Sequence, residues 1–308
     1  MDAQGGCEGR AARRARPREL EEPQVARGAL AVSIPALTDL SRCAVHTITT
    51  KPWSLRQCID GYTAAGVGGI TVWRQSLAPQ GLADSAMMLA DSGLKVVSLC
   101  RGGFFPAMDD AGRKAAVDDN RTAIDEAATI KAPLVVLVCG AIPGMPLQQA
   151  RDQIAEGIAA CVPYARERGV KLAIEPLHPQ YAADRSAVST MRQAREICDR
   201  VGSDYVGIAV DVYHLWWDQD LEQEIASAGK KNRLFAFHVC DWKVKQTDTL
   251  NDRGLMGEGC IDIRRIRGWV EAAGFTGFNE VEIFSEAHWA RDQQEFMTDI
   301  AAAYKKHV

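Results

Sequence analysis

The sequence predicts a single-domain α/β protein that folds as a (β/α)8 TIM barrel. Three observations support this fold: the length of 308 residues, the alternation of apolar runs with helical patterns, and the charged residues that end four consecutive runs. A barrel of this type takes roughly 250 residues, so one domain accounts for most of the chain. A content of 47% hydrophobic and 25% charged residues excludes a disordered or collagen-like protein.

Eight short apolar runs have the composition of β-strands. Most of them are continuous rather than alternating, as expected for parallel strands that are covered on both faces. The runs cover residues 43–49, 69–73, 95–100, 134–139, 170–175, 206–211, 234–239 and 279–284. Eight parallel strands, each followed by a helix, close most simply into a barrel.

Helical patterns separate these runs. The first has a capping box from Ser54 to Gln57 and ends at Gly66. The others cover residues 83–92, 114–130, 147–168, 187–200, 219–229, 262–273 and 288–304. A doubly wound sheet is the rival fold, but it would favour a glycine-rich turn after the first strand. The turn at residues 49–53 contains no glycine.

Residues 1–38 differ from the remainder of the chain. Arginine is abundant between residues 10 and 18, and no apolar stretch of the kind found in a secretory signal follows. We predict a disordered N-terminal extension over residues 1–38 and a barrel domain over residues 39–308. A transit peptide and a nucleic-acid-binding arm are the alternative interpretations of the extension.

Charge, hydropathy and cysteine content indicate which partners and which cellular compartment to expect. The 36 Lys and Arg residues are outnumbered by 40 Asp and Glu residues, which disfavours a nucleic-acid partner. No stretch of eighteen apolar residues occurs, so we expect no membrane-spanning helix. The nine cysteines are scattered, without a C-x-x-C pair, which predicts reduced thiols in a cytoplasmic protein and excludes a zinc ribbon.

The last four predicted strands end in chemically active side chains: Glu175, Asp211, His238 and Glu282. The active sites of barrels lie at the C-terminal ends of the strands. A charge at the end of an apolar strand is costly unless it is paired or binds a metal ion. Three carboxylates and one imidazole suit Mn²⁺, Mg²⁺ or Co²⁺. The alternative is that each charge caps a strand or pairs with a helix.

The later strand ends also resemble a known family. The matching segments are Ala-Ile-Glu175-Pro, Asp211-Val-Tyr-His214, Phe-His238-Val, Val281-Glu282 and the loop 257–262. Together they resemble the sugar phosphate isomerase/epimerase superfamily, the xylose isomerase-like TIM barrels. The resemblance covers the C-terminal half in the correct order, whereas the N-terminal half matches only as a strand–helix rhythm.

The resemblance implies roles for individual residues. It places one divalent cation, with Mn²⁺ expected, on Glu175, Asp211, His238 and Glu282. It makes Glu175 and Glu282 the acid/base pair, and it places His214 and Arg253 as substrate ligands. Such a site would remove a proton next to a carbonyl through a metal-stabilised enolate. We therefore expect an isomerase or epimerase of a keto-sugar, with a homodimer as the expected assembly.

Other reactions use the same first step. A lyase is the main alternative, either an inosose-type dehydratase or the catalytic subunit of a C-glycoside deglycosidase that acts on 3-oxo-glycosides with a small partner subunit. The sequence around Trp216 and Trp217 resembles a branch that is similar to such subunits, and this resemblance motivates the second of these. The rings of Trp73, Phe104, Phe105, Trp216 and Trp217 could stack a sugar or aglycone, with packing in the barrel and helices as the alternative. An endonuclease IV-like nuclease would need histidines after the second and third strands, and none occurs between His46 and His178.

Further substrate contacts are expected at the mouth of the barrel. His178 lies just past the fifth strand, Arg101 begins a glycine-bearing loop, and Trp73 ends the second strand. For each residue, packing within the barrel or its loops is the alternative. No basic glycine loop for phosphate follows the last two strands, which favours an unphosphorylated sugar or glycoside as the small-molecule substrate.

Two residues inside the predicted strands have open roles. His46 lies in the first strand and points either into the barrel bottom or into the site. Glu280 is two residues before Glu282, so both side chains share one face of the strand. Glu280 is therefore expected to support the site residues or to form an ion pair in the core.

Overall fold

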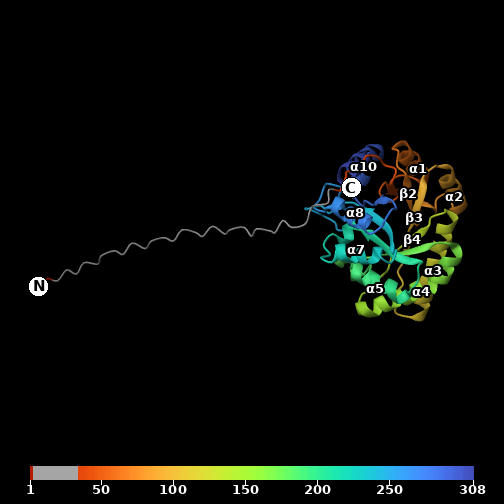
Figure 1. The fold of residues 1–308 in the computed structure, drawn as a ribbon, viewed down its shortest axis with the longest axis horizontal. Helices are drawn as coiled ribbons and strands as arrows, with labels where there is room; N and C mark the ends of the chain where they lie inside the picture. The colour runs from red at the N-terminus through yellow and green to blue at the C-terminus, as the bar shows by residue number, and fades with distance from the viewer. Residues whose placement is uncertain (3–33) are drawn as a thin grey trace. The chain divides into compact units, whose positions relative to one another are not determined.

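The computed structural model is a closed barrel of eight parallel strands in the order β1 to β8, surrounded by helices (Figure 1). It describes residues 1–2 and 34–308. The disorder predicted for residues 1–38 therefore falls mostly outside the described residues. The barrel unit begins at Ile34. Near its start, Leu37 packs against the core and the buried Arg267 guanidinium donates a hydrogen bond to the Pro35 carbonyl.

All eight predicted strands are present. They are β1 (Cys43–His46), β2 (Gly69–Trp73), β3 (Lys95–Gly103), β4 (Leu134–Val138), β5 (Lys171–Glu175), β6 (Val206–Asp211), β7 (Leu234–Val239) and β8 (Asn279–Val281). The barrel closes where β1 pairs with β8, with Cys43 opposite Asn279. The first strand is shorter than predicted because a turn follows it, in which the Thr49 N–H donates to the His46 carbonyl.

The predicted helices are also present. They are α1 (Leu55–Ala64), α2 (Leu82–Asp91), α3 (Asp110–Thr129), α4 (Leu147–Arg168), α5 (Met191–Val201), α7 (Leu221–Gly229), α8 (Ile263–Ala272) and α10 (Gln293–His307). The Ser54 capping box is formed, and Gly66 has φ of +76°. The final helical pattern is divided into α9 (Glu286–Trp289) and α10, because Ser285 and Asp292 each cap a helix start.

Three short elements were not predicted: α6 (Val212–Leu215) and the 3-10 turns η1 (Arg74–Ser76) and η2 (Pro179–Tyr181). Each follows the C-terminal end of a strand, where the active site of a barrel is built. In α6, the Asp211 carboxylate accepts the Tyr213 N–H and caps the turn.

Side chains along the strands alternate between the helix layer and the barrel interior. The outward residues belong to the main core with the helices, as Ile174, Val210 and Val239 do. The inward residues include Ala173, Ala209 and Ala236, which pack together inside the barrel. Each of these alanines lies two positions before Glu175, Asp211 or His238. The charged ends of β5 to β7 therefore lie in one layer above a layer of small apolar side chains.

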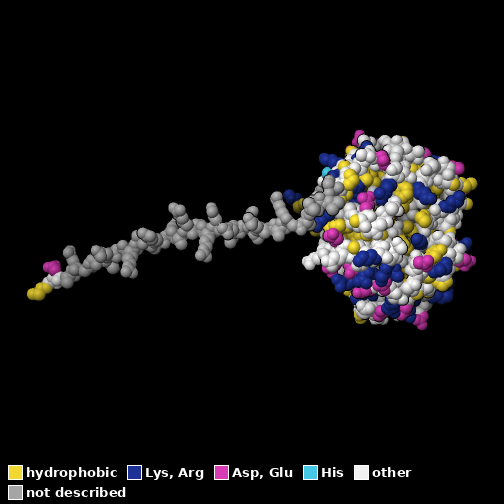
Figure 2. All heavy atoms as spheres, viewed as in Figure 1, with side chains coloured by type: hydrophobic (Ala, Val, Ile, Leu, Met, Phe, Trp, Pro, Cys, Tyr) yellow, Lys and Arg dark blue, Asp and Glu magenta, His cyan; other side chains and the backbone are white. Residues whose placement is uncertain are grey.

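The outer surface carries charges of both signs. Figure 2 shows Lys and Arg side chains interspersed with Asp and Glu side chains over the visible face. Many of them are paired; Asp199, for example, lies within 3.1 Å of both Lys231 and Arg233. No helix among the described residues is long and apolar enough to cross a membrane.

Gly103 is required where β3 meets β4. Its φ is +109°, and a Cβ there would overlap the Val138 carbonyl oxygen. We expect Gly103→Ala to lower the free energy of unfolding by about 3 kcal/mol or more, since it combines backbone strain with a steric clash. Gly144 is the control, because it has φ of +87° and a Cβ added there would have no atom within 4 Å. Gly144→Ala should cost about 1–2 kcal/mol. Equal losses in urea unfolding would contradict the clash.

Candidate metal centre

The structure brings Glu175, Asp211, His238 and Glu282 together inside the mouth of the barrel. Glu175 ends β5, Asp211 ends β6, His238 lies one residue before the end of β7, and Glu282 follows β8. Each offers one ligand atom, and these four atoms all lie within 4.8 Å of one another. All four side chains are buried. Parallel strands with a common inward face place them there.

A short contact in this tetrad joins the ends of β5 and β7. His238 Nδ1 lies 2.9 Å from Glu175 Oε1 and 3.9 Å from Glu282 Oε2. The 2.9 Å contact between His238 Nδ1 and Glu175 Oε1 lacks the direction of a hydrogen bond, and neither atom has another hydrogen-bond partner among the described residues. Buried polar atoms normally find a partner. A cation between the four ligand atoms would supply one, so the donor set fits a metal ion.

Arg253 partly balances the negative charge of the tetrad. Its Nη1 lies 2.9 Å from Glu282 Oε2 and 3.3 Å from Asp211 Oδ2. Its guanidinium carbon lies 4.4 Å from the centre of the Tyr213 ring and 4.8 Å from that of the Phe284 ring. Burial raises the pKa of Asp211 to about 7, because the charge of Arg253 offsets only part of the desolvation. The backbone N–H of Arg253 donates to the Phe284 carbonyl, which ties the segment around Arg253 to the segment that follows β8.

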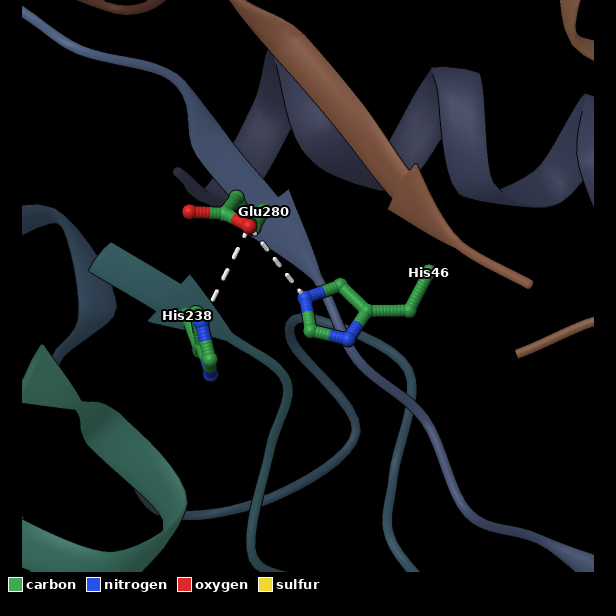
Figure 3. Close-up of side chains that lie close together, drawn as sticks. All are labelled: His46, His238 and Glu280. Atoms are coloured by element: carbon green, nitrogen blue, oxygen red, sulfur yellow. Dashed lines mark ion pairs between the residues drawn. The ribbon is translucent and has the colours of Figure 1, made fainter. Parts of the chain in front are cut away.

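A fourth carboxylate, Glu280, lies beneath the tetrad, and Figure 3 shows it between the imidazoles of His46 and His238. Its Oε2 is 3.5 Å from His46 Nε2 and 3.8 Å from His238 Nε2. The same oxygen accepts hydrogen bonds from the hydroxyls of Thr71 and Ser98. Both imidazole contacts are ion-pair distances rather than hydrogen bonds, since His46 Nε2 and His238 Nε2 have no hydrogen-bond partner among the described residues. His238 turns its other ring nitrogen, Nδ1, toward the tetrad.

His46 connects this lower layer to the tetrad. Its Nδ1 lies 3.1 Å from Glu282 Oε1 and 3.2 Å from the indole nitrogen of Trp73. A neutral His46 accepts the indole N–H at Nδ1, whereas a protonated one donates to Glu282 from the same nitrogen. Burial would lower the pKa of His46, but the carboxylates of Glu282 and Glu280 outweigh it and raise that pKa to about 9. Of the two positions open to His46, the structure has it point into the site.

A cavity of about 110 Å³ opens beside the tetrad. Of the predicted substrate contacts, Trp73, Arg101, His214 and Arg253 line it. Glu175 and Glu282 line it as well, whereas Asp211 and His238 are not among its lining residues. The mouth of the barrel therefore combines two carboxylates with aromatic and basic groups.

His178 is placed differently from the other predicted contacts. It is absent from the cavity lining, and its ring packs against Trp242 at 4.8 Å and Trp217 at 5.7 Å between centroids. Its backbone N–H donates to His214 Nδ1 over 3.3 Å. Burial, and then the charge of Arg253, lower the pKa of His214 well below its ordinary value, which favours a neutral imidazole.

The cavity also contains residues that the sequence analysis missed. These are Val138, Leu177, Tyr181, Arg185, Leu250 and Phe284. Phe284 lies two residues after Glu282, so the strand periodicity could have indicated it. Tyr181, Arg185 and Leu250 lie in connecting segments, where no periodic signal reports the direction of a side chain.

Comparison with known proteins agrees with the observed fold. The family model described as xylose isomerase-like TIM barrel matches residues 61–300. The chain belongs to this family. The match extends across both halves of the barrel. It therefore confirms the resemblance that the later strands suggested, and it includes earlier strands that the sequence motifs did not cover.

Relatives within the family differ in their distance from this chain. An inosose isomerase of Bacillus velezensis is 25% identical over 263 residues, which span 82% of this chain and 91% of the relative. The crystal structure of protein SMc04130 from Sinorhizobium meliloti 1021 is 45% identical, with a TM-score of 0.85 over 87% of this chain and 99% of that one. The IOLI protein, solved with a bound zinc atom, is 21% identical with a TM-score of 0.76 and the same coverage of both chains.

The pairing of Arg253 leads to a stability prediction. In chelator-treated protein, Arg253→Met should lower the free energy of unfolding by about 3–5 kcal/mol, because Asp211 would remain buried without a cationic partner and Glu282 would keep only His46. Arg101→Met is the control, since Arg101 has no ion pair among the described residues, and it should cost less than about 1 kcal/mol. Equal effects in urea unfolding would show that Arg253 does not stabilise the two carboxylates.

Proposed function

We propose that the protein is a divalent-metal-dependent isomerase or epimerase of a keto-sugar or a cyclic ketose of the inosose type. One observation carries the proposal: four metal-type ligands converge, and two of them, Glu175 and Glu282, also line the adjacent cavity. Sugar isomerisation and epimerisation both need two proton-transferring groups beside a carbonyl. The similarity to inosose isomerases supports a cyclic ketose as the first substrate to test.

Glu175, Asp211, His238 and Glu282 would hold the cation. Three oxygen donors and one imidazole suit Mn²⁺, Mg²⁺ or Co²⁺, and Mn²⁺ is the ion that we expect. The zinc atom of the related IOLI protein supports a divalent ion in a barrel of this fold. A bound cation would stabilise the negative charge that develops on the carbonyl oxygen of the substrate.

The two cavity-lining carboxylates would move the proton. One takes it from the carbon next to the carbonyl, and the other returns it. Return to the neighbouring carbon isomerises the sugar, whereas return to the same carbon from the opposite face epimerises it. Arg253 holds Glu282 at 2.9 Å. His214 lines the cavity, and its Nε2 lies 3.3 Å from Arg253 Nη2, so the two side chains would contact a substrate oxygen together. Of the aromatic side chains that could stack an aglycone in a lyase, Trp73 lines the cavity, whereas Trp216 and Trp217 do not.

Removal of either carboxylate tests this mechanism. Glu175→Gln and Glu282→Gln should each reduce exchange of the substrate proton into D₂O by about 10²–10⁴-fold, because each removes one proton-transferring group. NMR of an inosose or a ketohexose incubated with Mn²⁺-loaded protein measures this exchange. Glu156→Gln is the matched control, since Glu156 lies on helix α4, 3.7 Å from Arg200 and outside the cavity lining. Near-full exchange by either active-site variant would overturn the two-carboxylate mechanism.

Glu280 is proposed as a positioning residue for His238. Glu280→Gln should raise the dissociation constant for Mn²⁺ by about 10–100-fold, because an amide orients the imidazole less strongly than a carboxylate does. Competition with a chelator measures this constant, and nitrogen NMR of labelled histidine reports the tautomer of the metal-free protein. Glu271→Gln, at a surface ion pair with Arg42, is the control. Unchanged affinity and tautomer in Glu280→Gln would restrict Glu280 to a packing role.

A further inference from the structure

Three arginines line the cavity, and only one of them has an acidic partner among the described residues. Arg253 is buried and paired with Asp211 and Glu282. Arg101, in β3, and Arg185, between η2 and α5, are partly buried. Neither of these two makes an ion pair or a side-chain hydrogen bond with any other residue that the structure describes. Their charges are thus free to act on a molecule in the cavity.

The two unpaired arginines are held by other means. The Arg101 guanidinium carbon lies 4.3 Å from the centre of the Phe104 ring, and that of Arg185 lies 5.9 Å from the Tyr181 ring. Stacking on a ring face leaves the N–H edge of a guanidinium available. The backbone of Arg185 is tied to the end of β4, because the Gly140 N–H donates to its carbonyl over 2.9 Å. The side chains are therefore placed without a carboxylate to neutralise them.

Two like charges on one cavity wall are unfavourable without a counter-charge. Burial, and then the charge of Arg185, lower the pKa of Arg101. The charge of Glu175 offsets part of this effect, but neither Glu175 nor Glu282 forms an ion pair with Arg101 or Arg185, since Glu282 pairs with Arg253 and Glu175 contacts His238. The remaining lining residues on this side are apolar or aromatic: Val138, Leu177 and Tyr181 pack together. An anion carried by the substrate would supply the missing charge.

We propose that Arg101 and Arg185 form a binding subsite for an anionic group of the substrate, a carboxylate or a phosphate. This inference rests on the proposed function, and it narrows the substrate class to acidic or phosphorylated ketoses. A guanidinium binds either group through two parallel N–H donors, so no glycine-rich phosphate loop is required. The sequence favoured an unphosphorylated sugar or glycoside only because such a loop is missing. The side chains of the cavity wall provide a different way to bind an anion.

Equilibrium binding to the Mn²⁺-loaded protein tests the subsite with three six-carbon ketoses. They are neutral D-fructose, 5-keto-D-gluconate with a carboxylate, and D-fructose 6-phosphate. In titration calorimetry, at least one anionic ketose should bind at least about tenfold more tightly than fructose, because charge-assisted hydrogen bonds are added. The stronger of the two anions identifies the group that the subsite takes. Arg101→Gln and Arg185→Gln should each reduce the preference, and the double variant should abolish it.

Arg291→Gln is the control, because Arg291 pairs with Asp299 and does not line the cavity. Equal affinity for all three sugars, no binding of either anion, or an unchanged preference in the double variant would overturn the subsite. Binding does not require turnover, so the two proposals fail separately. Proton exchange on neutral ketoses without an anion preference would remove the subsite alone. An anion preference without exchange by the parent protein would remove the proposed reaction alone.

Discussion

The site depends on one geometric constraint, which is the closure of eight parallel strands into a barrel with alternating side chains. Once β1 pairs with β8, every strand has to point each second side chain into a narrow interior. The interior below the mouth has room for these side chains because several of them are small, as at Ala173, Ala209 and Ala236. The last inward residues of β5 to β7 and the residue after β8 then meet at the mouth. A ring of charges follows from the strand register and needs no specialised loop.

Buried charge is the energetic consequence of this geometry. Four carboxylates lie in or beneath the mouth: Glu175, Asp211, Glu280 and Glu282. Arg253, His46 and His238 face them, but the contact between Glu175 Oε1 and His238 Nδ1 lacks the direction of a hydrogen bond, and neither atom has another hydrogen-bond partner within the described part of the chain. Burial of charge is tolerated only where partners are present. The arrangement therefore favours a bound cation. It also places Glu280 next to the imidazoles of His46 and His238, one layer below Glu282.

The three arginines that line the cavity differ in whether they have an acidic partner. Arg253 is committed to the tetrad, and its position between aromatic rings and carboxylates makes it part of the centre. Arg101 and Arg185 stack on rings and have no acidic partner among the described residues. A substrate that contacts both sides would place its carbonyl near the carboxylates and its anion near these arginines. In this proposal, the carboxylates on one side of the cavity transfer the proton, and the arginines on the other side bind the anionic group of the substrate.

The sequence by itself determined the eight strands, the helices between them and the four charged strand ends. These depend on local signals, such as hydrophobic runs, caps and period-two spacing, which persist in the linear chain. It also determined that Glu280 shares a face with Glu282. It left open the direction of His46, because a single strand does not show which of its faces becomes the interior.

Only the tertiary structure decided which residues share the cavity. Arg185, Tyr181 and Leu250 come from connecting segments whose side-chain directions depend on packing against other strands. Packing also moved His178 away from the cavity lining, onto Trp242 and Trp217. The pairing of Arg253 and the lack of a described partner for Arg101 could not be foreseen, because ion pairs join groups that are distant in sequence. The sequence therefore gives the chemistry of the strand ends, and the packing of the loops decides what the cavity can recognise.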